Sequence, residues 1–414
     1  MYKRQDQGII AGCAGGGFEN ICAAADIIRG KYIGSDEFTF SVYPASTPIY
    51  MELVKNGAVA DLMEAGTIVK TAFCGPCFGA GDTPANNAFS IRHSTRNFPN
   101  REGSKLQSGQ IASVALMDAR SIAATALNGG KITAATDIEY ECTAPEYEFD
   151  SSAYDRRIYY GFGKADPSVE LVMGPNITDW PKMYALTENL LVKLAAVIHD
   201  PVTTTDELIP SGETSSYRSN PLRLAEFTLS RREPAYVGRA KEIAKLEGER
   251  RSGAVPAEIV ETLNRVGNGA ELANNTQFGS CVFANKPGDG SAREQAASCQ
   301  KVLGGFANIC YEYATKRYRS NCINWGILPF TIDDGTEFNY EPGDCLFVPG
   351  IRAAVENGTE NIPAKVIRQN GDVCDIMLHL RGLTPDEKEI ILDGCLMNYY
   401  AARAESVSYT HLRA

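Results

Sequence analysis

Apolar runs alternate with helix-like patterns over the first third of the chain. Residues 8–14 and 38–43 are short apolar runs that predict buried strands, and residues 68–73 predict another strand that leads into a turn. Residues 21–29 and 49–64 repeat their apolar positions with a helical period and predict helices. Strands that alternate with helices indicate an α/β layer built on a mostly parallel sheet.

The second half of the chain mixes short strands with helices. Residues 241–250 and 258–266 predict helices, and residues 366–376 predict a β-hairpin with an Asn-Gly turn. Thr384 and Glu387 have the spacing of a capping box, so we expect the last helix to begin there. This half therefore predicts a second α/β domain.

Two stretches of the chain predict a connection between the domains. Residues 143–167 are polar and rich in tyrosine and acidic residues, and residues 175–181 carry a cluster of helix and strand breakers. We expect an α/β domain at residues 6–142, a linker at residues 143–185 and a second domain at residues 186–404.

The two ends of the chain follow neither pattern. Residues 2–5 and residues 407–409 can both be written as translations of one transposon-end sequencing adapter, in opposite orientations. We therefore expect residues 1–5 and 405–414 to be non-native, and the natural product to be longer at one or both ends.

Composition argues against several classes of protein. The 414 residues carry a formal net charge of −11, whereas general nucleic-acid binders and membrane-surface binders favour basic faces. No apolar run approaches the roughly 18 residues of a membrane span, and no signal-peptide pattern is present. We expect a cytoplasmic protein whose twelve cysteines are reduced thiols, a few of them metal ligands.

Three cysteines are candidates for metal ligation. Cys74 and Cys77 form a Cys-Gly-Pro-Cys motif after a predicted strand, and Cys13 lies in a glycine-rich segment after another. Three thiolates can hold a cubane cluster and leave one iron open as a Lewis acid. The motif alone also fits a thioredoxin-like redox pair, half of a zinc site or buried cysteines.

Two further segments could bind anions. Arg96 and Arg101 lie in a loop rich in Pro and Asn and could present two guanidinium groups to carboxylates, although solvated surface charge is the simpler interpretation. Ser291 and Arg293 follow a glycine turn where a helix is expected to begin, a place that favours anions. The simpler interpretation of Ser291 is a helix N-cap.

Taken together and in order, these motifs resemble the aconitase family, which includes isopropylmalate isomerase and homoaconitase. The similarity extends, with gaps, from Gly8 to about Ala402. Residues 74–79 match the family's Cys-Gly-Pro-Cys-hydrophobic-Gly, and residues 96–101 resemble Arg-Asn-Phe-x-Gly-Arg. Three other segments match more loosely: residues 12–15 resemble the cluster loop Gly-Ser-Cys-Thr-Asn, residues 204–206 with Gly212 and Arg218 resemble the entry to the C-terminal domain, and residues 288–295 resemble Gly-x-Gly-Ser-Ser-Arg-Glu-His.

The resemblance implies a fold, a cofactor and a set of site residues. It implies a cluster-bearing α/β domain like aconitase domain 3, followed by a swivelling β/β/α-type domain like aconitase domain 4. It further implies that Cys13, Cys74 and Cys77 hold a 4Fe-4S cluster, that Ser291 is the catalytic base, and that Arg96, Arg101, Arg218 and Arg293 bind substrate carboxylates.

The implied reaction is the dehydration and rehydration of a hydroxy di- or tricarboxylate by an Fe–S-dependent, aconitate-hydratase-like hydro-lyase. In the family, the N-terminal domains that carry the acid–base histidines precede the segment that corresponds to Cys13. With only four histidines, this chain is expected to hold about half of an active site. Its expected partners are a small carboxylate substrate and the missing N-terminal domains of the same polypeptide, without which it would be inactive.

Several polar positions depart from the family pattern. Thr95 stands where the family has Asn, Ala292 where it has Ser, and Glu207 and Gln295 where it has His. A lost buried polar contact costs about 1–3 kcal/mol, enough to change the preferred substrate without changing the reaction class. We therefore expect a divergent hydratase.

Two other functions stay open at this point. One is a non-catalytic aconitase-like protein that binds a metabolite or RNA. The other is a thiol–disulfide oxidoreductase that uses Cys74 and Cys77.

Overall fold

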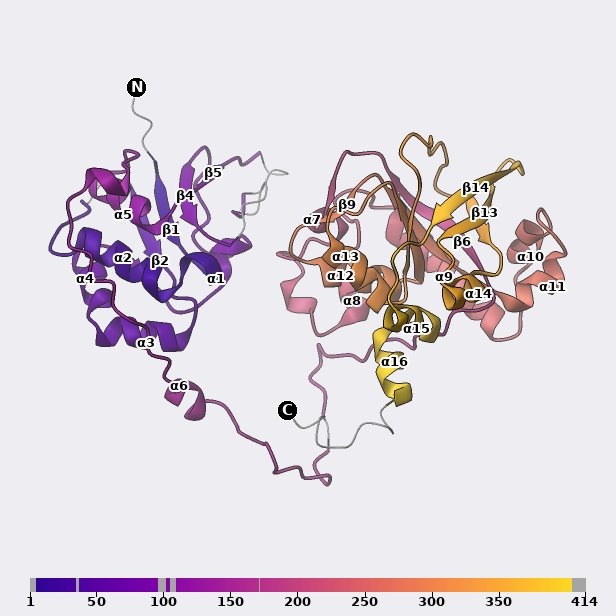
Figure 1. The fold of residues 1–414 in the computed structure, drawn as a ribbon, viewed down its shortest axis with the longest axis horizontal. Coiled ribbons are helices and arrows are strands. Elements are labelled where there is room, and N and C mark those ends of the chain that lie inside the picture. The colour runs from indigo at the N-terminus through magenta and orange to yellow at the C-terminus, as the bar shows by residue number, and fades with distance from the viewer. Residues whose placement is uncertain (1–4, 35–36, 96–101, 105–108, 171, 404–414) are drawn as a thin grey trace. The chain divides into compact units, whose positions relative to one another are not determined.

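The chain divides into two compact units, Met1–Ala165 and Asp166–Ala414, in a computed structural model (Figure 1). The structure describes residues 5–34, 37–95, 102–104, 109–170 and 172–403. The boundary between the units falls inside the predicted linker. Each unit has a hydrophobic core of its own and is described by itself.

A five-stranded sheet forms the centre of the first unit, and its order is β3-β2-β1-β4-β5. All neighbouring strands are parallel, which confirms the expected α/β layer. Because β4 returns to the other side of β1, the strand order reverses between β1 and β4. The strands are β1 (Gln7–Ile10), β2 (Thr39–Val42), β3 (Ile68–Val69), β4 (Phe89–His93) and β5 (Ser113–Leu116).

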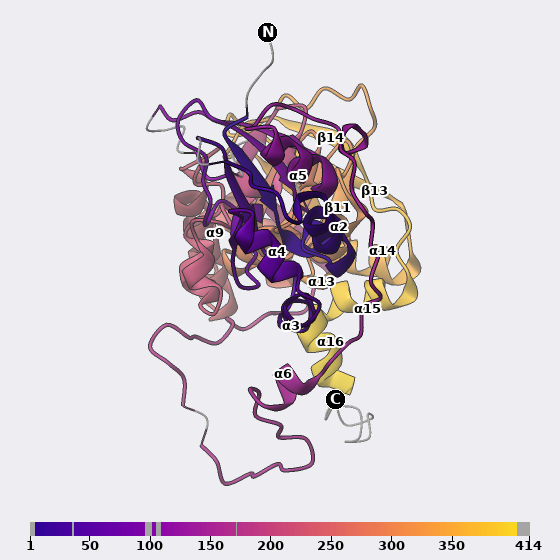
Figure 2. The ribbon, with the colours of Figure 1, turned by 90° about the vertical axis from the view of Figure 1, so that its left-hand side faces the viewer.

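Helices cover this sheet and bury its apolar side chains. Helix α2 (Phe18–Ile28) packs against α3 (Thr47–Lys55), α4 (Ala58–Glu64) and α5 (Ala119–Leu127) (Figure 2). The single helix predicted at residues 49–64 is wrong. It is divided into α3 and α4 because Gly57 takes a left-handed conformation with φ +85°, which ends a regular helix.

An irregular segment joins the two units. Between the short turn η3 (Ala135–Asp137) and strand β6, the described residues contain only one element, α6 (Ser152–Asp155). This agrees with the polar, breaker-rich composition of the region.

Seven strands close into a barrel in the second unit, in the order β10-β11-β14-β13-β12-β6-β8. Neighbours from β6 through β8 and β10 to β11 are parallel, and the remaining pairs are antiparallel. The strands are β6 (Asn189–Ile198), β8 (Thr276–Ala284), β10 (Gly305–Cys310), β11 (Leu328–Thr331), β12 (Cys345–Val348), β13 (Asn361–Ile367) and β14 (Val373–His379).

Helices surround the barrel, and α9 lies along β6 and β8 (Figure 1). A two-stranded parallel ribbon, β7 (Thr203–Thr204) with β9 (Pro287–Asp289), stands apart from the barrel. The helices are α7 (Thr205–Leu208), η4 (Ser215–Tyr217), α8 (Pro221–Ala225), α9 (Tyr236–Arg251), α10 (Ala257–Leu263), α11 (Gly269–Leu272), η5 (Ala273–Asn275), α12 (Arg293–Val302), α13 (Lys316–Asn324), α14 (Ile351–Asn357), α15 (Pro385–Asp393) and α16 (Leu396–Arg403).

Several local predictions for this unit are confirmed. Both predicted helices are present, as part of α9 and as α10, and the predicted hairpin is β13–β14. In the capping box, the backbone N–H of Glu387 donates to Thr384 Oγ1 (3.2 Å), and the N–H of Thr384 donates to Glu387 Oε2 (2.9 Å). The helix that begins there, α15, is not the last, because α16 follows it. The mixed α/β class is therefore confirmed, whereas a swivelling role for this unit stays a prediction. No helix in the described part of the chain is long and apolar enough to cross a bilayer.

Lys301 is a basic side chain in the core of the second unit. It lies on α12 and is only 4% exposed, its ammonium group donates to the Gly326 carbonyl (3.3 Å), and it lies 4.6 Å from the centre of the Phe306 ring. Burial lowers the pKa of Lys301 to about 7. The unfolded chain, with a lysine pKa of about 10.4, therefore holds this proton over a range in which the folded chain has lost it.

We predict that the stability of the wild type rises relative to that of Lys301→Met between about pH 7 and pH 10, a comparison in which the opposing contribution of the buried thiols cancels. This relative gain is expected to be on the order of 2–4 kcal/mol, because each unit of pKa difference corresponds to about 1.4 kcal/mol. Urea unfolding can be followed by the fluorescence of Trp180 and Trp325, the two tryptophans of the chain, which both lie in this unit.

Lys245→Met is the matched control, since the Lys245 side chain is 77% exposed on α9. A pH profile that is the same in the wild type and in Lys301→Met would contradict the assignment.

Candidate functional site

The candidate thiols of the first unit lie at the carboxyl edge of its sheet. Cys13 belongs to the four-residue α1 (Gly12–Gly15), which follows β1 directly, while Cys74 and Cys77 follow β3 and Thr95 follows β4. The loops after β1 and β4 leave the sheet at the point where the strand order reverses. In open α/β sheets this crevice is the usual place for a ligand.

Gly12 brings two of these cysteines into one neighbourhood. A Cβ atom on Gly12 would lie 2.5 Å from Cys77 Sγ and 2.9 Å from Thr95 Oγ1, and Gly12 has φ +71°. Thr95 Oγ1 in turn donates to Cys13 Sγ (3.6 Å) and accepts from the N–H of Ala14 (3.3 Å). Cys13 and Cys77, far apart in sequence, therefore approach the same Gly12–Thr95 contact.

Cys74 and Cys77 are held close together by a tight turn. The N–H of Cys77 donates to the Cys74 carbonyl (3.0 Å), and the motif forms the three-residue turn η1 (Gly75–Cys77). Cys13 and Cys74 are exposed, and Cys77 is half-buried. Cys13 and Cys74 are therefore accessible from solvent, and no set of three or more Cys, His, Asp or Glu side chains in the described residues is placed to hold a metal ion.

A cubane cluster places a different demand on the thiols from that of a single ion. A zinc ion draws its sulfur ligands to about 2.3 Å from one centre, whereas a cubane spreads its thiolates over separate iron atoms. Thiols from separate loops, two of which approach the Gly12–Thr95 contact, match the ligand type that such a cluster requires. They do not fit a compact single-ion site.

Most other cysteines are suited to the core instead. All twelve are among the described residues, and none forms a disulfide, as the composition predicts. Burial raises the pKa of Cys299, Cys322 and Cys345 to about 12 and that of Cys281 further still. Such thiols remain protonated at neutral pH and are poor metal ligands.

The second candidate site is built around the β7–β9 ribbon. Thr203 pairs with Pro287 and Thr204 with Asp289, so the two segments singled out in the sequence lie side by side. Gly290 lies directly against Thr205. It has φ +139°, and a Cβ atom there would lie 2.0 Å from Thr205 Oγ1. The loop that carries Ser291 is therefore fixed against the start of α7.

Ser291 does not cap the helix, so the simple N-cap interpretation is wrong. The N-cap residue of α12 is Ala292, which has no side chain able to accept a hydrogen bond. Ser291 is half-buried, and its hydroxyl has no hydrogen-bond partner among the residues that the structure describes. Arg293 Nε donates to Thr315 Oγ1 (3.2 Å), so its guanidinium group lies beside the Ser291 loop.

The two remaining motif positions of this unit differ in their surroundings. Arg218 follows η4, is exposed, and makes no ion pair with any described residue. Glu207 forms a capping box with Thr204, because its carboxylate accepts from the N–H (2.7 Å) and the hydroxyl (2.8 Å) of Thr204. The adjacent Asp206 pairs with Arg231 (2.7 Å).

The described residues include all but two of the candidates. Arg96 and Arg101 lie outside them. The structure groups Cys13 with Cys77 in the first unit, whereas Arg293, two residues after Ser291 in the sequence, binds Thr315 in the second. Arg92 is not among the residues predicted from the sequence, where its only signal is a charge within an otherwise buried strand.

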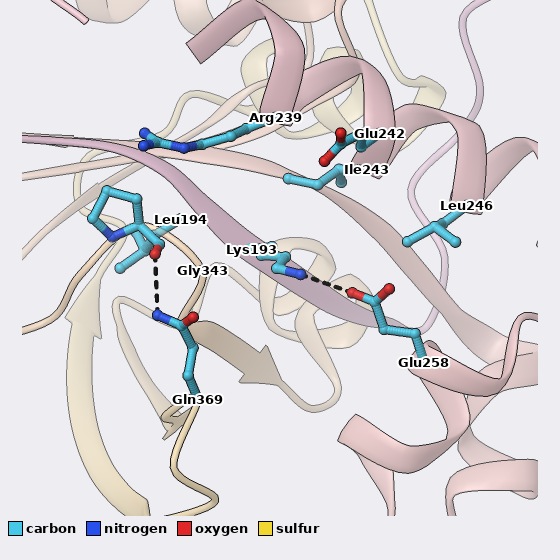
Figure 3. Close-up of a pocket in the computed structure, with 10 residues that line it drawn as sticks. Lys193, Leu194, Arg239, Glu242, Ile243, Leu246, Glu258, Gly343 and Gln369 are labelled. Atoms are coloured by element: carbon cyan, nitrogen blue, oxygen red, sulfur yellow. Dashed lines mark hydrogen bonds and ion pairs between the residues drawn. The ribbon is translucent and has the colours of Figure 1, made fainter. Parts of the chain in front are cut away.

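A separate pocket of about 220 Å³ lies between α9, α10 and the barrel (Figure 3). Its charged groups are largely engaged: Lys193 Nζ pairs with Glu258 Oε1 (2.7 Å) and Arg239 Nη1 with Glu233 Oε1 (3.0 Å), while the Gln369 amide donates to the Pro342 carbonyl (3.2 Å). It contains no residue that the sequence analysis selected.

Two segments of the chain match protein families. Residues 3–124 match the aconitase family (aconitate hydratase), and residues 261–335 match the aconitase C-terminal domain. These segments include all three candidate cysteines, Ser291 and Arg293, but not Arg218.

Individual relatives are dehydratases and related enzymes by name. The 3-isopropylmalate dehydratase large subunit of Mycolicibacterium smegmatis is 30% identical over 32% of this chain and 31% of its own length. The mitochondrial homoaconitase of Cryptococcus neoformans is 25% identical over 79% of this chain and 41% of its own length. The chain thus spans less than half the length of these relatives.

A solved 3-isopropylmalate dehydratase structure from Methanocaldococcus jannaschii covers 53% of this chain and 96% of that chain, at 19% identity and a TM-score of 0.31. That score is too low to support a fold assignment. On the family matches and the relatives, the chain belongs to the aconitase family.

We predict that Gly290→Ala destabilises the second unit by about 2–4 kcal/mol, because the new methyl group would collide with Thr205 and the backbone would be strained. The unfolding midpoint in urea, followed by tryptophan fluorescence, measures the loss. Gly253→Ala is the matched control, since Gly253 also has a positive φ (+91°) but faces open space. An equal loss in both variants would show that the contact with Thr205 contributes nothing.

Proposed function

We propose that the protein is an iron–sulfur-dependent hydro-lyase that dehydrates and rehydrates a hydroxy di- or tricarboxylate. The approach of Cys13 and Cys77 to the Gly12–Thr95 contact is the observation that supports this most directly. The names of the relatives, which include dehydratases, agree with the reaction class.

In this proposal Cys13, Cys74 and Cys77 hold a 4Fe-4S cluster. When bound, such a cluster supplies an iron without a protein ligand, a Lewis acid for a substrate hydroxyl and carboxylate. Cys13 and Cys74 are exposed at the carboxyl edge of the sheet, where ligands of open α/β sheets usually bind.

Ser291 takes the carbon-bound proton of the substrate. A hydroxyl is a weak base at its ordinary pKa, so it needs nearby positive charge to stabilise the alkoxide. In this proposal Arg293, two residues further along the chain and bonded to Thr315, provides this charge. Arg96, Arg101 and Arg218 bind substrate carboxylates, and the exposed Arg218 has no competing ion pair among the described residues.

The complete site requires further protein. Because the chain spans less than half of its relatives, we propose that other domains of the same polypeptide, or a second chain, supply the remaining acid–base groups. The activity therefore belongs to the assembled protein.

The test is anaerobic reconstitution of the protein encoded by the full parent gene. We expect a cubane signal in absorbance and electron paramagnetic resonance, and at least a 100-fold loss of hydratase activity in Cys74→Ser, because one ligand of the cluster is missing. Cys142→Ser is the matched control, since Cys142 is also exposed in the first unit but is no proposed ligand. A cluster that survives Cys74→Ser unchanged would contradict the proposal.

A second candidate is a non-catalytic relative that binds a carboxylate or RNA. The Ser291 hydroxyl favours this candidate, because none of the described residues accepts its proton. Binding of a citrate-like acid by the reconstituted parent protein, without turnover, would support it over the hydro-lyase.

The redox hypothesis gains no support from the fold. In thioredoxin-like proteins the reactive cysteine opens a helix whose dipole stabilises the thiolate. Here η1 is only three residues long, and residues 78–88, all of them described, contain no helix.

A further inference from the structure

Arg92 is a buried cation beneath the Cys74–Cys77 turn. It lies on β4 and is 2% exposed. Its Nη1 donates to the carbonyl of Pro76 (2.9 Å), which lies between the two cysteines, and its Nη2 donates to the carbonyl of Asp82 (3.0 Å). One guanidinium group therefore binds both ends of the loop that carries Cys77.

The partners of Arg92 are neutral. Its other donors bind Ser90 Oγ (2.9 Å) and Gln7 Oε1 (3.3 Å), and none of the described carboxylates forms an ion pair with it. The carboxylates of Asp82 and Glu102 accept hydrogen bonds from Tyr43 and Ser104 instead, but both lie close enough to favour the charged form of Arg92 electrostatically. Burial of a cation costs several kcal/mol, and it lowers the pKa of Arg92 in spite of these two carboxylates, so a further anion beside the guanidinium group would be stabilised.

Asp82, at the C-terminal end of the Cys74–Asp82 loop, is held by hydrogen bonds from two further side chains. Tyr43 donates to Asp82 Oδ2 (2.6 Å) and Lys70 Nζ to Asp82 Oδ1 (2.9 Å), while the backbone of Asp82 is left-handed, with φ +49°. Burial alone would raise the pKa of Asp82, but the hydrogen bonds from Lys70 and Tyr43 outweigh it and lower the pKa. Asp82 is thus a fixed, charged anchor in an uncommon conformation.

We infer that Arg92 is a positioning residue that fixes the Cys74–Asp82 loop and supplies a permanent positive charge to an anionic, thiolate-ligated group held by that loop. This inference rests on the proposed function for the nature of the group, but the clamp itself is a property of the metal-free chain. The guanidinium fork does both tasks because it is planar, has several donors and stays charged when buried.

Hydrogen–deuterium exchange of the metal-free protein tests the clamp. In Arg92→Gln we expect the amides of residues 74–82 to exchange at least 10-fold faster, while the amides of β1 and β2 are unchanged. Arg92→Lys is expected to exchange nearly as fast as Arg92→Gln, because an ammonium group cannot reach both carbonyls at once. Arg120→Gln, at an arginine whose side chain is 56% exposed in the same unit, is the matched control.

The reduction potential of the reconstituted protein tests the charge. We expect the potential to become more negative in Arg92→Gln and to return toward the wild-type value in Arg92→Lys, which keeps the charge but loses the fork. A purely structural role would move the potential equally in both variants.

The outcomes separate the inference from the proposed function. If the parent protein binds no cluster but Arg92→Gln loosens the loop, the clamp stands and the hydro-lyase proposal falls. If a cluster forms and exchange of residues 74–82 is the same in Arg92→Gln and wild type, the inference is overturned. Should Arg92→Gln fail to fold, the exchange of residues 74–82 is compared between Arg92→Lys and the wild type instead. Equal exchange rates in these two proteins would overturn the inference.

Discussion

Gly12 has no side chain, and the first candidate site depends on that absence. Any Cβ atom at this position would lie within 3 Å of both Cys77 and Thr95, so a larger residue would push the Cys77 loop away from the end of β1. The sheet provides the rest, because strand order alone brings the segments after β1 and β4 to one crevice. The absence of a Cβ atom at Gly12 and the reversal of strand order together bring distant parts of the chain to one candidate ligand site.

Both units bury a cation, and the two cations have different consequences. Lys301 has a carbonyl and an aromatic face as partners, so its proton is easily given up when the core excludes water. Arg92 cannot give up its proton in the accessible pH range, and it donates to four neutral oxygens instead. The lysine therefore makes stability depend on pH, whereas the arginine leaves a fixed charge close to the cysteines.

Local patterns in the sequence predict local structure well. The alternation of strands and helices before residue 131 and the capping box at Thr384 depend on neighbours in sequence, and both are present. The break at Gly57 was missed because the apolar pattern continues through it. Barrel closure depends on pairings such as β6 with β8 and β10 with β11, which no local pattern encodes.

The candidate site was predictable only in part for the same reason. Short motifs identify Cys74, Cys77 and Ser291, but the contact of Cys77 with Gly12 arises from the sheet, and the role of Arg92 appears only when its hydrogen-bond partners are known. Glu207 stands at a position where the family has histidine. Its carboxylate binds the start of α7, on which the Ser291 loop rests, so the substituted residue maintains the local structure. A loop kept in place by new contacts favours a changed substrate over a decayed site.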